Sequence, residues 1–356
     1  MRRKNLIVKR KVKNKNLLNK NLKIKKIYKK FRTIILNNIG RNNFALGVSG
    51  GPDSLCLAYF SKLYTSEFKN KMYILIVNHN LRKESYKESQ KVKKILKKNK
   101  IESKIIHWKG KIPKSNVQSE ARNIRYSLIA KFCAKKNIRY LVTAHHADDQ
   151  IENFFIRLFR GSGLTGLSSM AETVSYNSKL KIVRPFLNIK KTHLKFATLN
   201  YFKTYIKDPS NQNEKFLRVR IRKYRKTMEA EGLNTSSVIK TINNLLLANK
   251  ALNYYKNRAL NKHVSFLTQN KCLINKKIFS EEAEEIVFKS FSGILSLVSG
   301  KYYPPRSKKI MNLISRIKRI KYEKSTLGGC VIEKKDNFLI ISREAKVKKV
   351  FQQSMK

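Results

Sequence analysis

The sequence predicts an α/β protein built around a parallel sheet that helices cover on both faces. Three observations support this prediction: short apolar runs recur from about residue 43 onward, helix-forming stretches separate them, and several of the runs end in polar clusters. Strands that alternate with helices indicate βαβ units with parallel strands. Ligands of such sheets bind beyond the carboxyl ends of the strands, so the polar clusters predict where an active site lies.

Residues 26–215 are expected to form this central domain. A first helix is expected over residues 26–39. The predicted strands are Phe44–Val48, Tyr73–Val77, Ser103–Trp108, Tyr140–Ala144 and Lys181–Phe186. The helices expected between them are Ser54–Tyr64, Glu84–Lys98 and Glu120–Lys135. Each of these segments has the length and composition typical of a strand or a helix, and polar residues lie at its ends.

Three further segments flank the central domain. Residues 1–25 are a basic arm, either a disordered tail or a tether for phosphates. Residues 216–262, rich in helix formers, are expected to be a helical connector. Residues 263–356 are expected to form a smaller α/β domain, because they combine helix-like and strand-like stretches. Its expected elements are helices Ser280–Ser296 and Ser307–Lys321 and a hairpin of Cys330–Glu333 with Phe338–Ser342.

The charge of the chain points to an acidic partner. Lys and Arg number 80 against 22 Asp and Glu, a net charge of +58, while 41% hydrophobic residues are enough for a sizeable core. Nucleic acid is the first expectation and an anionic membrane the second. Lys, Asn and Ile have A/T-rich codons, so compositional drift is an alternative source of part of the excess. The arginines are therefore the more informative cations.

The four cysteines and the apolar runs exclude several classes of protein. Cys56, Cys133, Cys272 and Cys330 form neither a CxxC pair nor a metal-ligand cluster, so they are expected to be idle thiols in a reducing cytosol. The apolar runs are too short to cross a bilayer, and the N-terminus lacks a secretory h-region. We expect no membrane partner and a cytoplasmic location in a bacterium, with an organellar matrix as the alternative.

The segment SGGPDS, between the first strand and the next helix, is the strongest candidate for the chemistry. Gly50 and Gly51 allow close backbone approach, and Pro52 suits a first helical turn. Successive N–H groups and the hydroxyls of Ser49 and Ser54 then form an anion cradle. The loop lacks the Lys of a Walker A motif. It carries Asp53 instead, and a carboxylate beside a polyphosphate implies a bridging Mg²⁺.

The SGGPDS loop resembles the signature of the PP-loop ATP pyrophosphatases, Rossmann-like enzymes that cleave ATP to AMP and pyrophosphate. Other segments resemble one branch of them, the tRNA(Ile)-lysidine synthetases. These segments are Asn78–Arg82 with Glu84-Ser85, Asn116–Tyr126, Ala144–Glu152 with Arg160–Leu167, Asp208–Arg222, and, near the C-terminus, Thr326–Cys330 with Arg343-Glu344. The resemblance is strong over residues 43–225 and weaker over 280–345.

Asp149 and Glu152 are three residues apart and share one helical face. Two carboxylates in a cleft suit a cationic ligand such as free lysine; the alternative is a solvated first turn that favours acids through the helix dipole. The family resemblance implies that Asp149 and Glu152 bind lysine and take part in catalysis. It also places Asp53, as metal ligand, and Arg125 at the catalytic centre.

His145 ends the fourth predicted strand and is expected to face the nucleotide. Arg122 lies one helical turn from Arg125, and Arg218 lies one turn from Arg222. Arginine suits bidentate phosphate contacts, so Arg122, Arg218 and Arg222 are expected to bind tRNA or phosphate. His146 and His79 carry no assigned role and are interpreted as satisfied buried histidines.

The resemblance implies an enzyme that uses ATP and Mg²⁺ to join L-lysine to the 2-carbon of the wobble cytidine of isoleucine tRNA with a CAU anticodon. It also implies tRNA recognition by residues 216–262 and 263–356. The alternatives are a tRNA 2-thiolation enzyme of the same fold, which the absence of CxxC disfavours, a small-molecule synthetase, and a non-catalytic RNA-binding protein. A homodimer is compatible with the sequence.

Overall fold

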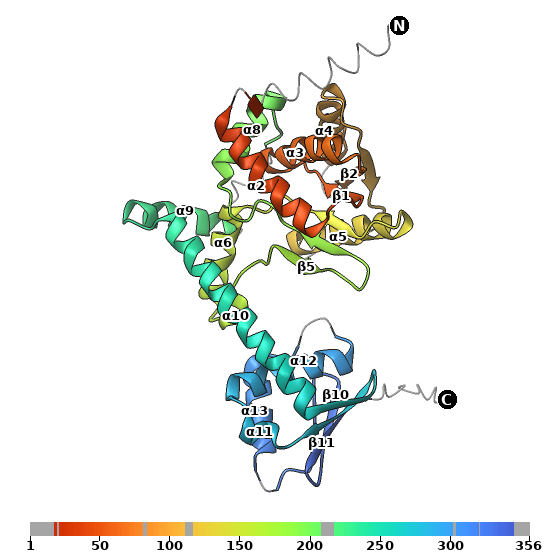
Figure 1. Cartoon of the computed structure of the whole chain (residues 1–356), viewed down its shortest axis with the longest axis vertical. Coiled ribbons are helices and arrows are strands. Elements are labelled where there is room, and N and C mark those ends of the chain that lie inside the picture. Colours follow the sequence, from red (N-terminus) through yellow and green to blue (C-terminus); the bar gives the residue numbers. More distant parts are fainter. Residues whose placement is uncertain are drawn as a thin grey trace, which may run out of the picture. The chain divides into compact units, whose positions relative to one another are not determined.

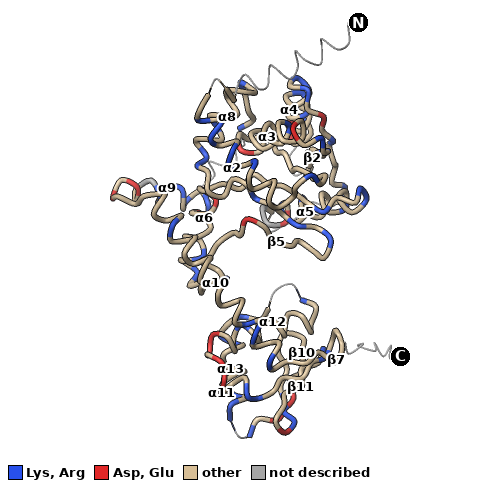
Figure 2. Tube along the Cα trace, viewed as in Figure 1, with Lys and Arg blue, Asp and Glu red and all other residues tan. Residues whose placement is uncertain are grey.

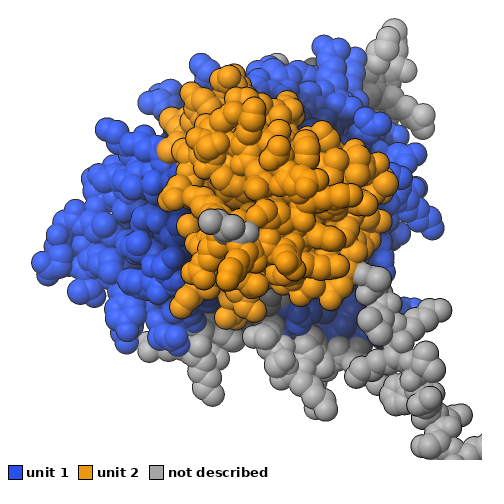
Figure 3. Space-filling model, turned by 90° about the horizontal axis from the view of Figure 1, so that it is seen from below, with its two compact units in different colours: residues 1–246 blue, residues 247–356 orange. Residues whose placement is uncertain are grey.

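A computed structural model describes residues 18–19, 21–80, 84–110, 117–207, 217–301, 304–319 and 321–344. The chain divides into two compact units, residues 1–246 and 247–356, which Figure 3 colours separately. Several features singled out in the sequence lie outside the described residues. These are most of the basic arm, Leu81 and Arg82, Asn116, and the start of the last motif at 208–216.

A six-stranded sheet forms the centre of the first unit (Figure 1). The five predicted strands are confirmed as β1 (Phe44–Gly47), β2 (Met72–Asn78), β3 (Lys104–His107), β4 (Tyr140–Val142) and β6 (Lys181–Val183). They run parallel in the order β3-β2-β1-β4-β6. The sequence does not predict β5 (Thr173–Ser175), an edge strand antiparallel to β6, because three largely exposed residues carry no apolar alternation.

The helices of the first unit alternate with the strands as expected. They are α2 (Leu22–Asn38), α3 (Pro52–Phe68), α4 (Ser85–Lys98), α5 (Val117–Lys135), α6 (Ala147–Leu158), α7 (Leu164–Leu167), α8 (Lys191–Phe202) and α9 (Leu217–Ala230). Helix α10 (Thr235–His263) contains the boundary between the two units.

Both faces of the sheet are buried because successive strand residues point to opposite sides. Phe44 and Leu46 of β1 join one core with Phe60 of α3. Ala45, between them in sequence, joins a second core with Ile129 of α5. Helices α3 and α5 therefore cover opposite faces of the sheet (Figure 1).

Helix α2 begins earlier than the sequence predicts. The side chain of Asn21 accepts a hydrogen bond of 3.1 Å from the Ile24 amide, which is a typical helix N-cap. Ile24 is completely buried against the first core. Residues 22–25, assigned to the basic arm from their charge, thus belong to a helix in which Ile24, Ile27 and Phe31 are buried between exposed lysines.

The second unit contains an antiparallel sheet in the order β7-β8-β11-β10-β9. Its strands are β7 (Val264–Thr268), β8 (Lys271–Asn275), β9 (Lys324–Leu327), β10 (Cys330–Lys335) and β11 (Phe338–Arg343). The predicted hairpin is confirmed as β10 and β11, which turn at Asp336 with a φ of 48°. The sequence does not resolve β7, β8 and β9.

Helices α11 (Ile278–Glu281), α12 (Glu284–Ser299) and α13 (Ser307–Ile317) complete this unit. The helix predicted over Ser280–Ser296 is in fact two helices, because the backbone of Glu282 is extended. Phe291 and Ile294 of α12 pack on the sheet in the second unit's own core.

All four cysteines are free and buried, as predicted. None of the helices in the described parts of the chain is long and apolar enough to cross a membrane.

Positively and negatively charged residues are distributed very differently along the chain. Figure 2 shows Lys and Arg along most elements of both units, whereas Asp and Glu occupy a few short stretches. A general surface charge of this kind attracts polyanions but does not locate a site. The places where acids gather are therefore more informative than the places where cations do.

We predict that Phe31→Ala lowers the free energy of unfolding of the first unit by about 3–5 kcal/mol. Phe31 of α2 is completely buried and contacts the rings of Phe60, Tyr64 and Phe186. The matched control is Leu36→Ala in the same helix, where the side chain is 38% exposed and the expected loss is well under that of Phe31→Ala. Urea denaturation measures both, and equal losses would contradict the packing described.

Candidate active site

The candidate site lies where the strand order of the first sheet reverses. Strand β1 has β2 and β3 on one side and β4 and β6 on the other, so the chain leaves β1 and β4 in opposite directions. Crevices at such switch points, beyond the carboxyl ends of the strands, are the usual ligand sites of open α/β sheets. The SGGPDS loop follows β1, and the block that contains His145 and His146 follows β4.

The geometry of the SGGPDS loop agrees with an anion cradle. Gly50 has a φ of 87°, and a Cβ atom there would lie 2.5 Å from Cγ2 of Val92, so only glycine fits without displacement. Pro52 starts α3 directly after the Gly51 cap. The Ser54 hydroxyl accepts a bond of 3.2 Å from the Ser49 amide and donates one of 3.0 Å to the Gly51 carbonyl. The loop thus presents the amino end of α3, with its unpaired N–H groups and positive dipole, to a ligand.

Two hydrogen bonds from residues in and after α8 hold the backbone of this loop in place. Thr198 Oγ1 donates a hydrogen bond of 2.6 Å to the Pro52 carbonyl, and the Ile206 amide donates one of 2.9 Å to the Gly50 carbonyl. Sequence reasoning missed both residues. No local signal could have found them, because their roles come from the packing of α8 against α3.

Asp53, in the first turn of α3, has one carboxylate oxygen without a partner. Its Oδ1 is buried and makes no hydrogen bond, while Oδ2 lies 3.5 Å from Nε2 of His146. The described residues contain no group of three or more His, Cys, Asp or Glu side chains placed to hold a metal. A single carboxylate oxygen beside a phosphate cradle nevertheless fits Mg²⁺, which commonly binds one or two carboxylates together with substrate phosphates.

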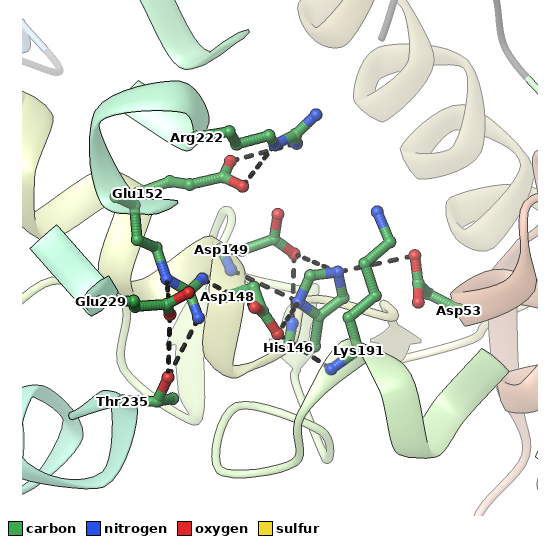
Figure 4. A network of polar contacts seen from close by, with 10 residues as sticks. Asp53, His146, Asp148, Asp149, Glu152, Lys191, Arg222, Glu229 and Thr235 are labelled. Atoms are coloured by element: carbon green, nitrogen blue, oxygen red, sulfur yellow. Dashed lines mark hydrogen bonds and ion pairs between the residues drawn. The ribbon is translucent and has the colours of Figure 1, made fainter. Parts of the chain in front are cut away.

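Three carboxylates surround His146 at the start of α6 (Figure 4). His146 Nδ1 accepts a hydrogen bond of 3.3 Å from the Asp149 amide, and the Asp149 carboxylate accepts one of 3.1 Å from the His146 amide, which is a capping box. Nδ1 also lies 3.7 Å from Asp148 Oδ2. Burial alone would lower the pKa of His146, but the hydrogen bond to Asp53 and the charges of Asp149, Asp53 and Asp148 raise it overall.

Two arginines of α9 compensate the acids of α6, and Figure 4 labels the first of them, Arg222, beside Glu152. Arg222 donates two hydrogen bonds to the Glu152 carboxylate, at 2.5 and 3.1 Å, and Glu152 is only 2% exposed. Arg225 donates a bond of 2.7 Å to Asp148. Burial would raise the pKa of Asp148, but the Lys191 amide and Arg225 outweigh it and lower that pKa.

These pairs change the picture drawn from the sequence. Glu152 and Arg222, expected to bind lysine and phosphate separately, bind each other. Arg225 contacts Asp148 of α6. Asp149 retains a side chain that is 15% exposed, so it is the more accessible of the two predicted lysine ligands. No role was predicted for Asp148 from the sequence. Its position next to Asp149 was the one sequence feature that could have marked it as a site residue.

The predicted residues Arg122 and Arg218 lie near His145. His145 receives a bond of 3.1 Å from Arg122, and its Nδ1 lies 2.9 Å from the Thr143 hydroxyl. Arginine is only a donor, so the proton of His145 lies on Nδ1. Burial and the charges of Arg122, Arg184 and Arg218 hold the pKa of His145 well below its usual value. His145 is therefore neutral and orients Arg122.

A cavity of about 200 Å³ opens beside the SGGPDS loop. Ser49, Ile76 and Val92 line it together with His79 and Arg125. Arg125 Nε donates a bond of 3.3 Å to His79 Nε2. Burial, with a smaller contribution from the charge of Arg125, lowers the pKa of His79 to about 4. The predicted catalytic residue Arg125 thus lies at this cavity, while Asp149 and Glu152 lie on α6.

Comparison with known proteins agrees with this geometry. Residues 18–226 match the family model described as a PP-loop domain. The tRNA(Ile)-lysidine synthase of Orientia tsutsugamushi (strain Boryong) is 33% identical over 307 residues, which cover 84% of this chain and 69% of the relative. The enzyme of that name from Wolbachia pipientis wMel is 34% identical over 326 residues, 90% of this chain and 75% of the relative.

Among solved structures, the U34-tRNA thiolase NcsA from Methanococcus maripaludis with its [4Fe-4S] cluster is similar to this chain. The TM-score is 0.54 and the sequence identity 20%, over 63% of this chain and 78% of that one. At this identity the likeness shows the fold alone.

We predict that Arg222→Ala lowers the free energy of unfolding by about 3–5 kcal/mol, because it leaves the buried Glu152 carboxylate without its partner. The control is Arg32→Ala, which breaks an ion pair with Glu67 in which both side chains are more than a third exposed. That loss should be at most about 1 kcal/mol. Urea denaturation distinguishes the two, and a small loss in both variants would show that Glu152 is not buried in solution.

The low pKa of His79 predicts a loss of stability in acid. Above its ordinary pKa of 6.5 the histidine is neutral in folded and unfolded chains alike; between 6.5 and about 4 the unfolded chain binds the extra proton. Stability therefore falls as the pH is lowered through this window, by at most about 1.4 kcal/mol per pH unit from this group. Urea denaturation at several pH values should show a shallower decline for His79→Gln. An unchanged decline would contradict the assignment.

Proposed function

Because the chain belongs to the tRNA(Ile)-lysidine synthase family of PP-loop enzymes, we propose that it joins free L-lysine to the wobble cytidine of isoleucine tRNA with a CAU anticodon. The enzyme is an ATP-dependent ligase. The observation that carries the proposal is the meeting of a phosphate cradle with the acidic start of α6, where His146 Nε2 lies 3.5 Å from Asp53. Such a site brings an ATP-binding group and a cation-binding group to one crevice.

In the first step, the 2-carbonyl oxygen of the cytidine attacks the α-phosphorus of ATP and pyrophosphate leaves. The backbone N–H groups of Gly50, Gly51 and Asp53 and the dipole of α3 bind the phosphates and stabilise the charge that develops on them. A Mg²⁺ ion held by Asp53 Oδ1 and phosphate oxygens would supply further charge neutralisation. The nucleoside of ATP occupies the cavity beside Ser49, with Arg125 at its wall.

In the second step, the ε-amine of lysine, once it has lost its proton to a neighbouring carboxylate, attacks the 2-carbon of the adenylated cytidine, and AMP leaves. Asp149 binds the cationic amino acid, because it is the more exposed of the two predicted acids. Glu152 acts through Arg222, which it holds in place. His145 acts in the same way through Arg122, and Arg122 and Arg218 face the phosphates of the nucleotide or tRNA. Catalysis by positioning and charge requires no protein nucleophile.

The tRNA itself is a polyanion that the general positive charge of the chain attracts. The bacterial relatives support action in a bacterial cytoplasm, where ATP, lysine and tRNA are available. The second unit and the last part of α10 supply further surface for the tRNA, which is far larger than the crevice.

The test is incubation of the protein with ATP, radiolabelled lysine and a transcript of that tRNA. We predict label in the RNA and equal release of AMP and pyrophosphate. Asp53→Asn and Asp149→Asn preserve side-chain shape but remove the charge, and each should lower incorporation on the order of 10²-fold or more. Asp336→Asn, an exposed change in the β10–β11 turn, is the control and should have no effect.

Three results would contradict the proposal. Sulfur transfer to the RNA without lysine incorporation would indicate a 2-thiolation enzyme. RNA binding without ATP turnover would indicate a non-catalytic protein. Full activity of either Asp→Asn variant would show that the role assigned to that residue is wrong.

A further inference from the structure

His146 is a buried polar side chain to which the proposed reaction assigns no role. It is 3% exposed and stands at the junction of the two parts of the site, between the loop that follows β1 and the helix that follows β4. The sequence suggested only a satisfied buried histidine. Its contacts show that its two ring nitrogens do different things.

The position of the ring proton follows from the helix cap. Nδ1 accepts the hydrogen bond from the Asp149 amide, so in the neutral ring the proton lies on Nε2. That N–H points between two carboxylates, with Nε2 3.5 Å from Asp53 Oδ2 and 3.6 Å from Asp149 Oδ2 (Figure 4). One ring nitrogen thus fixes the ring to α6, and the other faces both acids.

The two acids lie on separate elements. Asp53 is in the first turn of α3 and Asp149 in the first turn of α6, and like charges so close would repel each other. Among the described residues, the contact of His146 with Asp53 is the only hydrogen bond or ion pair between the SGGPDS loop and α6 or its cap. The imidazole N–H therefore sets how far apart the two carboxylates stand.

We propose that His146 is a positioning residue that aligns the two half-sites: it holds the Asp53 side chain of the phosphate site in register with the Asp149 side chain of the lysine site. The inference rests on the proposed function and adds a residue to it. Without His146, ATP and lysine each still bind their own half-site, but the α-phosphate and the ε-amine are no longer held in the relative position that the reaction needs. Misplacement of reacting groups by about 1 Å costs on the order of 10²-fold in rate.

Two substitutions separate alignment from helix capping. His146→Asn keeps an acceptor near the place of Nδ1, and asparagine is a favoured N-cap, but the side chain no longer reaches Asp53. His146→Gln keeps an N–H donor near the place of Nε2 and loses the cap. We expect His146→Asn to melt close to the wild type, with kcat for lysine incorporation lowered on the order of 10²-fold and the KM values for ATP and lysine within a few-fold.

We expect the reverse pattern for His146→Gln: a lower Tm, with kcat within about tenfold of the wild type. A purely structural role would make kcat follow Tm in both variants, and that result would overturn the inference. So would wild-type kcat in His146→Asn, or a loss of its binding to a non-hydrolysable ATP analogue, since His146 would then be a ligand-binding residue.

Two controls keep the outcomes distinct. Absence of lysine incorporation by the wild type would refute the proposed function itself rather than the role of His146. Nitrogen-15 NMR of the histidine rings in the wild type, which needs no variant to fold, should show the proton of the neutral His146 ring on Nε2 when recorded at a pH where that ring is neutral. A neutral ring with its proton on Nδ1 would overturn the inference directly.

Discussion

The arrangement of the site depends on one electrostatic constraint: four carboxylates lie next to a cradle built for phosphates. Asp53, Asp148, Asp149 and Glu152 would repel each other and any polyphosphate unless their charge were compensated. Arg222 compensates Glu152, Arg225 and the Lys191 amide compensate Asp148, and His146 stands between Asp53 and Asp149. Helix α9 is therefore part of the site, although none of its residues follows a strand of the sheet.

This compensation leaves a limited set of groups to act on ligands. The bidentate pair with Arg222 occupies one acceptor position on each oxygen of Glu152, and the 2% exposure of that side chain leaves little room for a substrate cation. Asp149 and the Oδ1 atom of Asp53 remain on either side of His146. Under the proposed function, the cationic amino acid and the nucleotide phosphate would have one acid each, with His146 between the two acids.

The net charge of +58 has a different meaning from these local pairs. It raises the local concentration of a polyanion around the whole surface and speeds association, but it is not specific to a site. The arginines that contribute to the site are those that contact a carboxylate or a histidine, namely Arg122, Arg125, Arg222 and Arg225. Most lysines in the described parts of the chain are exposed, where substitutions generally change stability little.

The sequence by itself determined the alternation of strands and helices, the SGGPDS loop and the acids of α6. These features depend on local chemistry: apolar periodicity, glycine conformation, and the spacing of residues on a helix. It could not determine the start of α2, the short strands β5 and β7–β9, or the roles of Thr198 and His146. Nor could it show that Arg222 and Glu152, 70 residues apart, bind each other. Those depend on which elements the fold places side by side, and contacts between distant segments leave no periodic signal in a single sequence.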